Sequence, residues 1–156
     1  MKNKFKFAYM ETARIWKKLS YSEKLKVGAI IVAENAILIG YNGTPAGWDN
    51  APEYKLYTDD LTDTNYSFVD EHGRYRLKAK PETIHAEMNA LAKLAKTRLS
   101  GENGILFSTT APCINCATAL YNAGIREVYF EDEYKNALGL DFLRKCNVHI
   151  EQLILE

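Results

Sequence analysis

Four side chains stand at spacings that could build a catalytic zinc site. His85 precedes Glu87 by two residues, and Cys113 and Cys116 form a Cys-x-x-Cys pair directly after Pro112. One imidazole and two thiolates are a sound ligand set for zinc. Three protein ligands leave the fourth position for water, which is what a catalytic zinc requires.

A structural zinc site is the alternative at this point. Such a site would take a fourth protein ligand, and Cys146 or His149 could supply it. The chain has only three cysteines, and an odd, small number predicts metal or catalytic chemistry rather than a disulfide framework. Cys146 stands alone, and a buried, small apolar residue is the simpler interpretation of it.

The spacing of these residues constrains the helices that carry them. Cys113 and Cys116 are three apart, so both thiols fall on one face of the first turn of a helix, with Pro112 in its first position. The positive end of that helix favours thiolate. His85 and Glu87 can approach one metal only if His85 lies at the very start of its helix, because a spacing of two mid-helix points to opposite sides.

The apolar periodicity predicts an alternation of helices and strands around this site. Helices are expected at residues 5–19, 84–95, 112–122 and 136–145. Strands are expected at residues 27–33, 36–41, 105–108, 125–130 and 148–153. From residue 84 onward the order is helix then strand, three times. Together with the leading hairpin, this predicts an α/β fold, a three-layer α/β/α sandwich around a mixed five-stranded sheet.

We expect residues 1–156 to form a single domain, because no linker, repeat or low-complexity tract divides them. Residues 42–50 are dense in turn formers. Residues 51–80 are polar and aromatic with little periodicity, and we predict an irregular insertion there.

The composition of the chain limits the kinds of partner that it can bind. Lys plus Arg and Asp plus Glu both number 20, so the net charge is zero, which argues against a long nucleic-acid track. The basic start of the chain is followed by no apolar signal region, and no stretch is long enough to span a membrane. We therefore expect a cytoplasmic protein with neither membrane nor nucleic acid as a partner.

His-x-Glu followed by Pro-Cys-x-x-Cys is the signature of zinc deaminases. The chain resembles the deoxycytidylate (dCMP) deaminase family, within the cytidine-deaminase-like superfamily, over roughly residues 7–150. The segments that carry the resemblance are residues 27–32, 40–47, 85–90 and 112–116. The segment Gly-Tyr-Asn-Gly-Thr-Pro-Ala-Gly resembles the nucleotide-monophosphate branch rather than the tRNA-editing or nucleoside branches. The resemblance implies hydrolysis of dCMP to dUMP and ammonia, which supplies dUMP for thymidylate synthesis.

The resemblance also implies roles for individual residues. His85, Cys113 and Cys116 match the zinc ligands, and Glu87 matches the group that carries a proton from the attacking water to the ring nitrogen and the leaving ammonia. Four residues match substrate contacts: Asn42 for the sugar hydroxyl, a backbone amide at Ala111 for the base, and Tyr134 and Lys96 for the phosphate. Lys24 and Lys93 are alternatives to Lys96.

Regulation and assembly are implied by the resemblance as well. Family members are activated by dCTP and inhibited by dTTP, each with Mg²⁺ on the triphosphate, and are commonly homohexamers. The residues expected to line the effector site are Asn42, Gly43, Pro45, Gly47, Trp48 and Asp49. The alternative is that this loop only shapes the rim of the active site. Residues 50–80 contain no Cys and one His, so the second, structural zinc of some relatives is not expected.

Two other functions stay open from the sequence. A nucleic-acid-editing deaminase would use the same zinc chemistry but would need a basic groove for the strand. A zinc-stabilised binding module without catalysis would have no need of Glu87. The sequence also leaves dCMP and dCTP as possible substrates.

Overall fold

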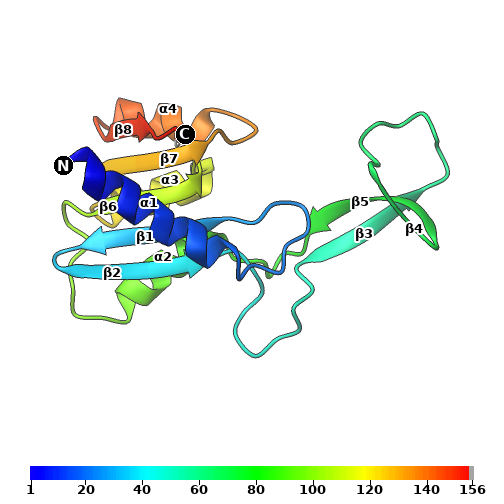
Figure 1. The fold of residues 1–156 in the computed structure, drawn as a ribbon, viewed down its shortest axis with the longest axis horizontal. Coiled ribbons are helices and arrows are strands. Elements are labelled where there is room, and N and C mark those ends of the chain that lie inside the picture. Colours follow the sequence, from blue (N-terminus) through cyan, green and yellow to red (C-terminus); the bar gives the residue numbers. More distant parts are fainter. Residues whose placement is uncertain (155–156) are drawn as a thin grey trace.

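A mixed sheet forms the body of the molecule in a computed structural model that describes residues 1–154 (Figure 1). Its strand order is β2-β1-β6-β7-β8. β1 pairs antiparallel with β2 and β6, whereas β6, β7 and β8 are parallel. The strands are β1 (Gly28–Ala33), β2 (Ala36–Tyr41), β6 (Ile105–Thr110), β7 (Glu127–Asp132) and β8 (His149–Gln152). The predicted mixed five-stranded sheet is confirmed.

Helices cover both faces of this sheet. α1 (Asn3–Lys17) buries Met10 and Ala13 on one face against Ile30, Phe107 and Tyr129. The other face and its helices share a second apolar cluster. These helices are α2 (Ala86–Ala95), α3 (Ile114–Asn122) and α4 (Leu138–Lys145). The predicted three-layer α/β/α sandwich is therefore confirmed.

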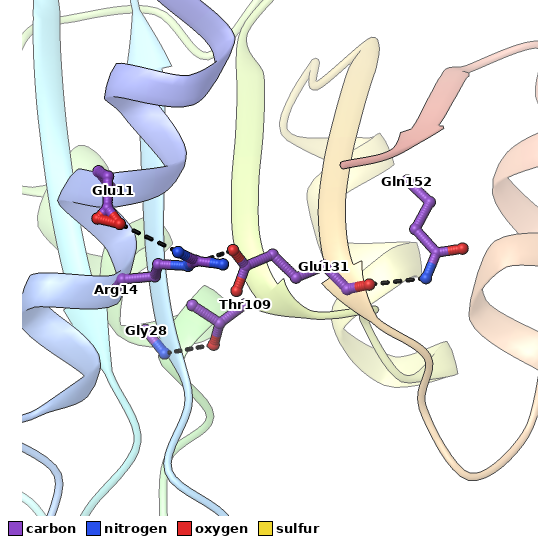
Figure 2. A network of polar contacts seen from close by, with 6 residues as sticks. All are labelled: Glu11, Arg14, Gly28, Thr109, Glu131 and Gln152. Atoms are coloured by element: carbon purple, nitrogen blue, oxygen red, sulfur yellow. Dashed lines mark hydrogen bonds and ion pairs between the residues drawn. The ribbon is translucent and has the colours of Figure 1, made fainter. Parts of the chain in front are cut away.

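A chain of polar contacts fixes α1 to the sheet (Figure 2). The Arg14 guanidinium donates to the Glu131 carboxylate on β7. The backbone of Glu131 accepts a hydrogen bond from Gln152 Nε2 at 2.7 Å, and Thr109 on β6 accepts one from the Gly28 N–H at 3.1 Å. These contacts join α1 to β7, β8 to β7, and β1 to β6, so they link the helix to the sheet and neighbouring strands to one another.

Residues 51–80 are not irregular, and the prediction for them is wrong. They contain a separate antiparallel sheet, in the order β3-β5-β4, that projects from the body as an arm (Figure 1). Its strands are β3 (Glu53–Thr58), β4 (Phe68–Asp70) and β5 (Gly73–Ala79). Tyr75 and Leu77 alternate with charged residues along β5 and are buried, while Tyr57 and Phe68 lie 5.5 and 5.4 Å from Tyr75 between ring centroids. Cross-strand aromatic contacts of this kind stabilise an isolated small sheet.

The helix starts near the candidate site are close to expectation, with one correction. α2 begins at Ala86 with His85 as its N-cap, as the spacing required. α3 begins at Ile114 with Cys113 as N-cap, so Pro112 precedes the cap and is not in the first helical position. Across residues 1–154, no helix combines the length and apolar character that a membrane span needs.

Candidate active site

The three predicted metal ligands lie together. His85 Nδ1 is 3.6 Å from Cys113 Sγ and 3.4 Å from Cys116 Sγ, and the three ligand atoms all lie within 4.8 Å of one another. Nitrogen and sulfur atoms that share a tetrahedral zinc are about 3.5 Å apart, given bonds of about 2.0 Å to nitrogen and about 2.3 Å to sulfur. The residues present therefore fit zinc.

No fourth protein ligand joins this cluster within residues 1–154. Cys146 packs against the apolar core, and His149 lies beside Tyr129 and within 3.6 Å of the Glu151 carboxylate. The two residues that could have closed a structural site are therefore occupied elsewhere. Three ligands with an open position favour a catalytic metal over a structural one.

Two helix N-termini meet at the ligands. His85 caps α2 and Cys113 caps α3, where Cys113 Sγ accepts a hydrogen bond from the Cys116 N–H at 3.5 Å. The pKa of Cys113 is lowered to about 4, first by the Cys116 thiol and then by His85 and the Cys116 N–H. The hydrogen bond to Cys113, with burial, raises the pKa of Cys116. The lowered pKa favours the thiolate form of Cys113, which is the form that binds metal.

Glu87 lies in the first turn of α2 with 4% of its surface exposed. It is not part of the ligand cluster. Burial raises the pKa of its carboxyl to about 7, with the charge of His85 acting in the opposite direction. A carboxyl group with a pKa near neutrality can both accept and return a proton at physiological pH, as a general acid–base catalyst must.

A pocket of about 330 Å³ opens beside the ligands. Its lining includes the zinc-site residues His85, Glu87 and Cys113, and it also includes Lys24 and Lys135. The other residues along it are Ser22, Leu25, Val27, Asn42, Glu53, Ala79, Thr83, Ala86, Thr110, Ala111, Glu133 and Tyr134. Its size and mixed lining suit one small polar ligand.

The structure does not bring Lys96 to this pocket. Lys96 is the C-cap of α2, whereas the pocket lies at the helix's N-terminus, about 15 Å away along a helix of ten residues. Lys93 is on the same distant turn and donates to the Ile39 carbonyl at 2.7 Å. Among the lysines considered from the sequence, only Lys24 lines the pocket, and Lys135 was missed.

Asn42, Ala111 and Tyr134 all lie along the pocket, as the resemblance implied, but two of them have groups already engaged. The Ala111 N–H donates to the Asp132 carbonyl at 2.8 Å, so this backbone amide is already engaged within the protein. Asn42 Oδ1 accepts from Ser20 Oγ and the Val27 N–H at 2.7 and 2.8 Å, and its Nδ2 donates to the Leu25 carbonyl. The Asn42 side chain therefore holds the segment before β1 in place.

Of the residues expected to bind the effector, Asn42 lines the pocket, whereas Gly43, Pro45, Gly47, Trp48 and Asp49 do not. Gly47 has a φ of +85°, which favours glycine. Trp48 is 58% exposed, and its N–H donates to the Pro45 carbonyl at 3.1 Å. The loop is a defined turn with an exposed aromatic side chain.

The chain is similar in sequence to known proteins. Residues 3–132 match the family described as the cytidine and deoxycytidylate deaminase zinc-binding region. The deoxycytidylate deaminase of Enterobacteria phage T2 is 30% identical over 149 residues, covering 80% of this chain and 79% of the phage protein. ComE operon protein 2 of Bacillus subtilis is 30% identical over 135 residues, or 85% of this chain. The match spans 62% of that relative's length.

A solved structure is similar over nearly the whole chain. The dCMP deaminase of cyanophage S-TIM5, crystallised in complex with dCMP and dUMP, superposes with a TM-score of 0.80 at 35% identity. The superposition covers 98% of this chain and 99% of the cyanophage chain. The similarity therefore includes the arm as well as the sheet and its helices.

Proposed function

The chain belongs to the dCMP deaminase family of the cytidine-deaminase-like superfamily, and from this premise we propose that it hydrolyses dCMP to dUMP and ammonia. One observation carries the proposal. His85, Cys113 and Cys116 hold their ligand atoms at zinc-sharing distances, and the buried Glu87 lies beside them in the same pocket. The product would supply thymidylate synthesis, and we place the reaction in the cytoplasm.

His85, Cys113 and Cys116 would hold the zinc. When bound, the metal lowers the pKa of a water molecule to about 7, so that a nucleophile is available at neutral pH. Glu87 accepts the proton that the attacking water loses. It passes this proton to the ring nitrogen. It then takes the second proton from the oxygen that has added to the ring carbon and delivers it to the departing amino group, which leaves as ammonia. The buried position of Glu87 keeps bulk water from competing for these protons.

The phosphate of dCMP needs cationic or hydrogen-bonding groups, and the pocket offers both. Lys24 and Lys135 line it from opposite parts of the sequence, and Tyr134 adds a hydroxyl group. We assign the phosphate contact to these residues in place of Lys96. Asn42 would meet the sugar with the second N–H of its amide.

Regulation by dCTP and dTTP, each with Mg²⁺, and assembly into a homohexamer are also part of the proposal. They rest on the resemblance and on the exposed loop from Asn42 to Asp49, where Trp48 could stack on a nucleotide. An oligomer would explain why so large an aromatic side chain is left at the surface.

The test is an assay of purified protein with its zinc content measured. Ammonia release is followed from deoxycytidine, dCMP and dCTP, with and without dCTP or dTTP as effectors and Mg²⁺. We expect turnover of dCMP and little turnover of deoxycytidine. Equal rates on the two would contradict the substrate assignment, and turnover unaffected by either triphosphate would contradict the regulation.

A further inference from the structure

Glu53 is the first residue of β3, at the root of the arm, and it also lies along the pocket. Its carboxylate accepts hydrogen bonds from a segment about thirty positions earlier in the chain. Ser22 Oγ donates to Oε1, the Lys24 N–H donates to Oε1 at 3.2 Å, and the Glu23 N–H donates to Oε2 at 3.2 Å. One side chain of the arm thus binds three consecutive residues of the segment that carries Lys24.

The same segment is held at its two ends by another residue. Asn42 binds Ser20 on one side and Leu25 and Val27 on the other. The stretch from residue 22 to 24 lies between these attachments and meets Glu53. The position of the Lys24 side chain in the pocket therefore depends on the contacts of Glu53.

The backbone next to Glu53 is held in place by hydrogen bonds. The preceding residue, Pro52, accepts hydrogen bonds from the Lys80 N–H at 2.8 Å and from Thr83 Oγ1 at 2.7 Å. Thr83 is another residue of the pocket lining. The root of the arm is thus attached to the body at the pocket wall, which gives the Glu53 carboxylate a defined place from which to act.

The charge of Glu53 argues for the same role. An unattached carboxylate in this pocket would repel the phosphate of a nucleotide. Three donors instead occupy its oxygens, and bonds from backbone N–H groups to a carboxylate are charge-assisted and strong. The negative charge of Glu53 is thereby balanced by donors of residues 22–24, which weakens its repulsion of the phosphate.

We propose that Glu53 is a positioning residue that orders residues 22–24 and so places Lys24 against the phosphate of the substrate. The part that concerns phosphate rests on the proposed function. The part that concerns the order of the segment does not, because it follows from the hydrogen bonds alone.

The first experiment measures amide hydrogen exchange by NMR at Glu23 and Lys24. Glu53→Ala should speed exchange at both amides by about tenfold or more, because both lose their acceptor. Asp70→Asn is the matched control, since Asp70 is an acid of the same arm that binds Lys55 and Tyr57 outside the pocket. Unchanged exchange in Glu53→Ala would overturn the proposal, whatever the activity.

The second experiment separates KM from kcat. Glu53→Ala should raise the KM for dCMP about tenfold or more with kcat altered less than about threefold, because the reacting groups are untouched. Glu53→Gln keeps an acceptor oxygen for Ser22, so its KM for dCMP should lie between those of the parent protein and Glu53→Ala. A lower KM for dCMP in Glu53→Gln would mean that the charge merely repels phosphate, and the proposal would be wrong. If exchange responds as expected but the parent protein does not turn over dCMP, the proposed function fails and the ordering role stands.

Discussion

His85 and Cys113 occupy the same position in their respective helices, as the residue that caps the N-terminus, and Nδ1 of one lies 3.6 Å from Sγ of the other. The two helix N-termini therefore converge on one point. Their dipoles stabilise negative charge at that point, and thiolate and carboxylate are the negative groups found there. The site is built by convergence of helix ends rather than by a long loop.

Loss of a ligand should empty the metal site without unfolding the protein. His85→Ala is expected to reduce zinc content from about one ion per chain to almost none and to abolish turnover. The apolar core on the same face of the sheet is large, so the fold should persist with a lower Tm. Elemental analysis and thermal unfolding measure both effects. Cys146→Ala, a cysteine outside the cluster, should keep its zinc.

Glu87→Gln should separate metal binding from catalysis. The amide cannot carry the proton, so kcat should fall by about a hundredfold to ten-thousandfold, with zinc content unchanged. Steady-state kinetics and metal analysis are read on the same sample. Glu71→Gln is the matched control, because the Glu71 side chain is 85% exposed on the arm. Full activity in Glu87→Gln would support a zinc-stabilised binding module instead.

Two lysines should control affinity for the phosphate. Lys24→Ala and Lys135→Ala should each raise the KM for dCMP about tenfold or more, since each removes a charged partner of phosphate. Lys96→Ala should leave KM unchanged, because Lys96 caps the far end of α2. An effect confined to Lys96→Ala would show that the pocket assignment is wrong.

Substitution by alanine should destabilise the protein at Gly40 but have little effect at Gly43. A Cβ at Gly40 would lie 2.1 Å from the Ala86 carbonyl oxygen and 2.6 Å from the Ala90 nitrogen. Gly40→Ala should therefore displace α2 and lower the free energy of unfolding by about 1–3 kcal/mol or more. Gly43→Ala has no neighbour within 4 Å and should change it by less than about 0.5 kcal/mol. Urea unfolding compares the two, and equal losses would argue against close packing at Gly40.

The arm should make a pH-dependent contribution to its own stability. Hydrogen bonding from the Tyr57 hydroxyl, then from the His72 N–H and Lys55, lowers the pKa of Asp70 from 3.8 to about 2. Because the folded-state pKa is depressed, the contribution is complete above the unfolded value of about 3.9 and disappears as the pH falls toward 2. NMR titration of the Asp70 carboxyl carbon measures this midpoint.

Tyr57→Phe should move that midpoint upward, toward the ordinary value for an aspartate. Tyr54→Phe is the comparison, because Tyr54 is an exposed tyrosine of the same strand that makes no hydrogen bond to Asp70. A parent protein whose Asp70 titrates near 3.8 would contradict the hydrogen-bonded geometry.

The Cys113–Cys116 pair and the main sheet could be predicted from short-range spacing, whereas His85 was joined to the two cysteines through the resemblance to the deaminase signature. Cys113 and Cys116 share a helical turn, and the strands carry continuous apolar runs whose alternation with helices leaves few topologies. The assignment of Lys96 to the phosphate site was wrong because sequence similarity gives no distances between residues. In the structure, the length of α2 separates Lys96 from the pocket at the other end of the helix.

The arm and Glu53 could not be predicted in the same way. The pattern on β5, with Tyr75 and Leu77 alternating among charged residues, is short, and its aromatic partners come from two other strands. Glu53 is an ordinary acidic residue until its partners at Ser22 and Lys24 are brought against it by folding. Contacts between distant segments leave no periodicity to detect.

The hydrogen bond between Lys80 and Pro52 brings the two ends of the arm together at a single place on the body. Insertions, deletions or replacement of the residues between these two ends should therefore leave the strands of the main sheet in place. What the body of the molecule requires from the arm, under the proposal for Glu53, is one acidic side chain at its base. A change in the outer part, which carries the exposed Leu61 and Val69, should therefore leave the wall of the pocket in place.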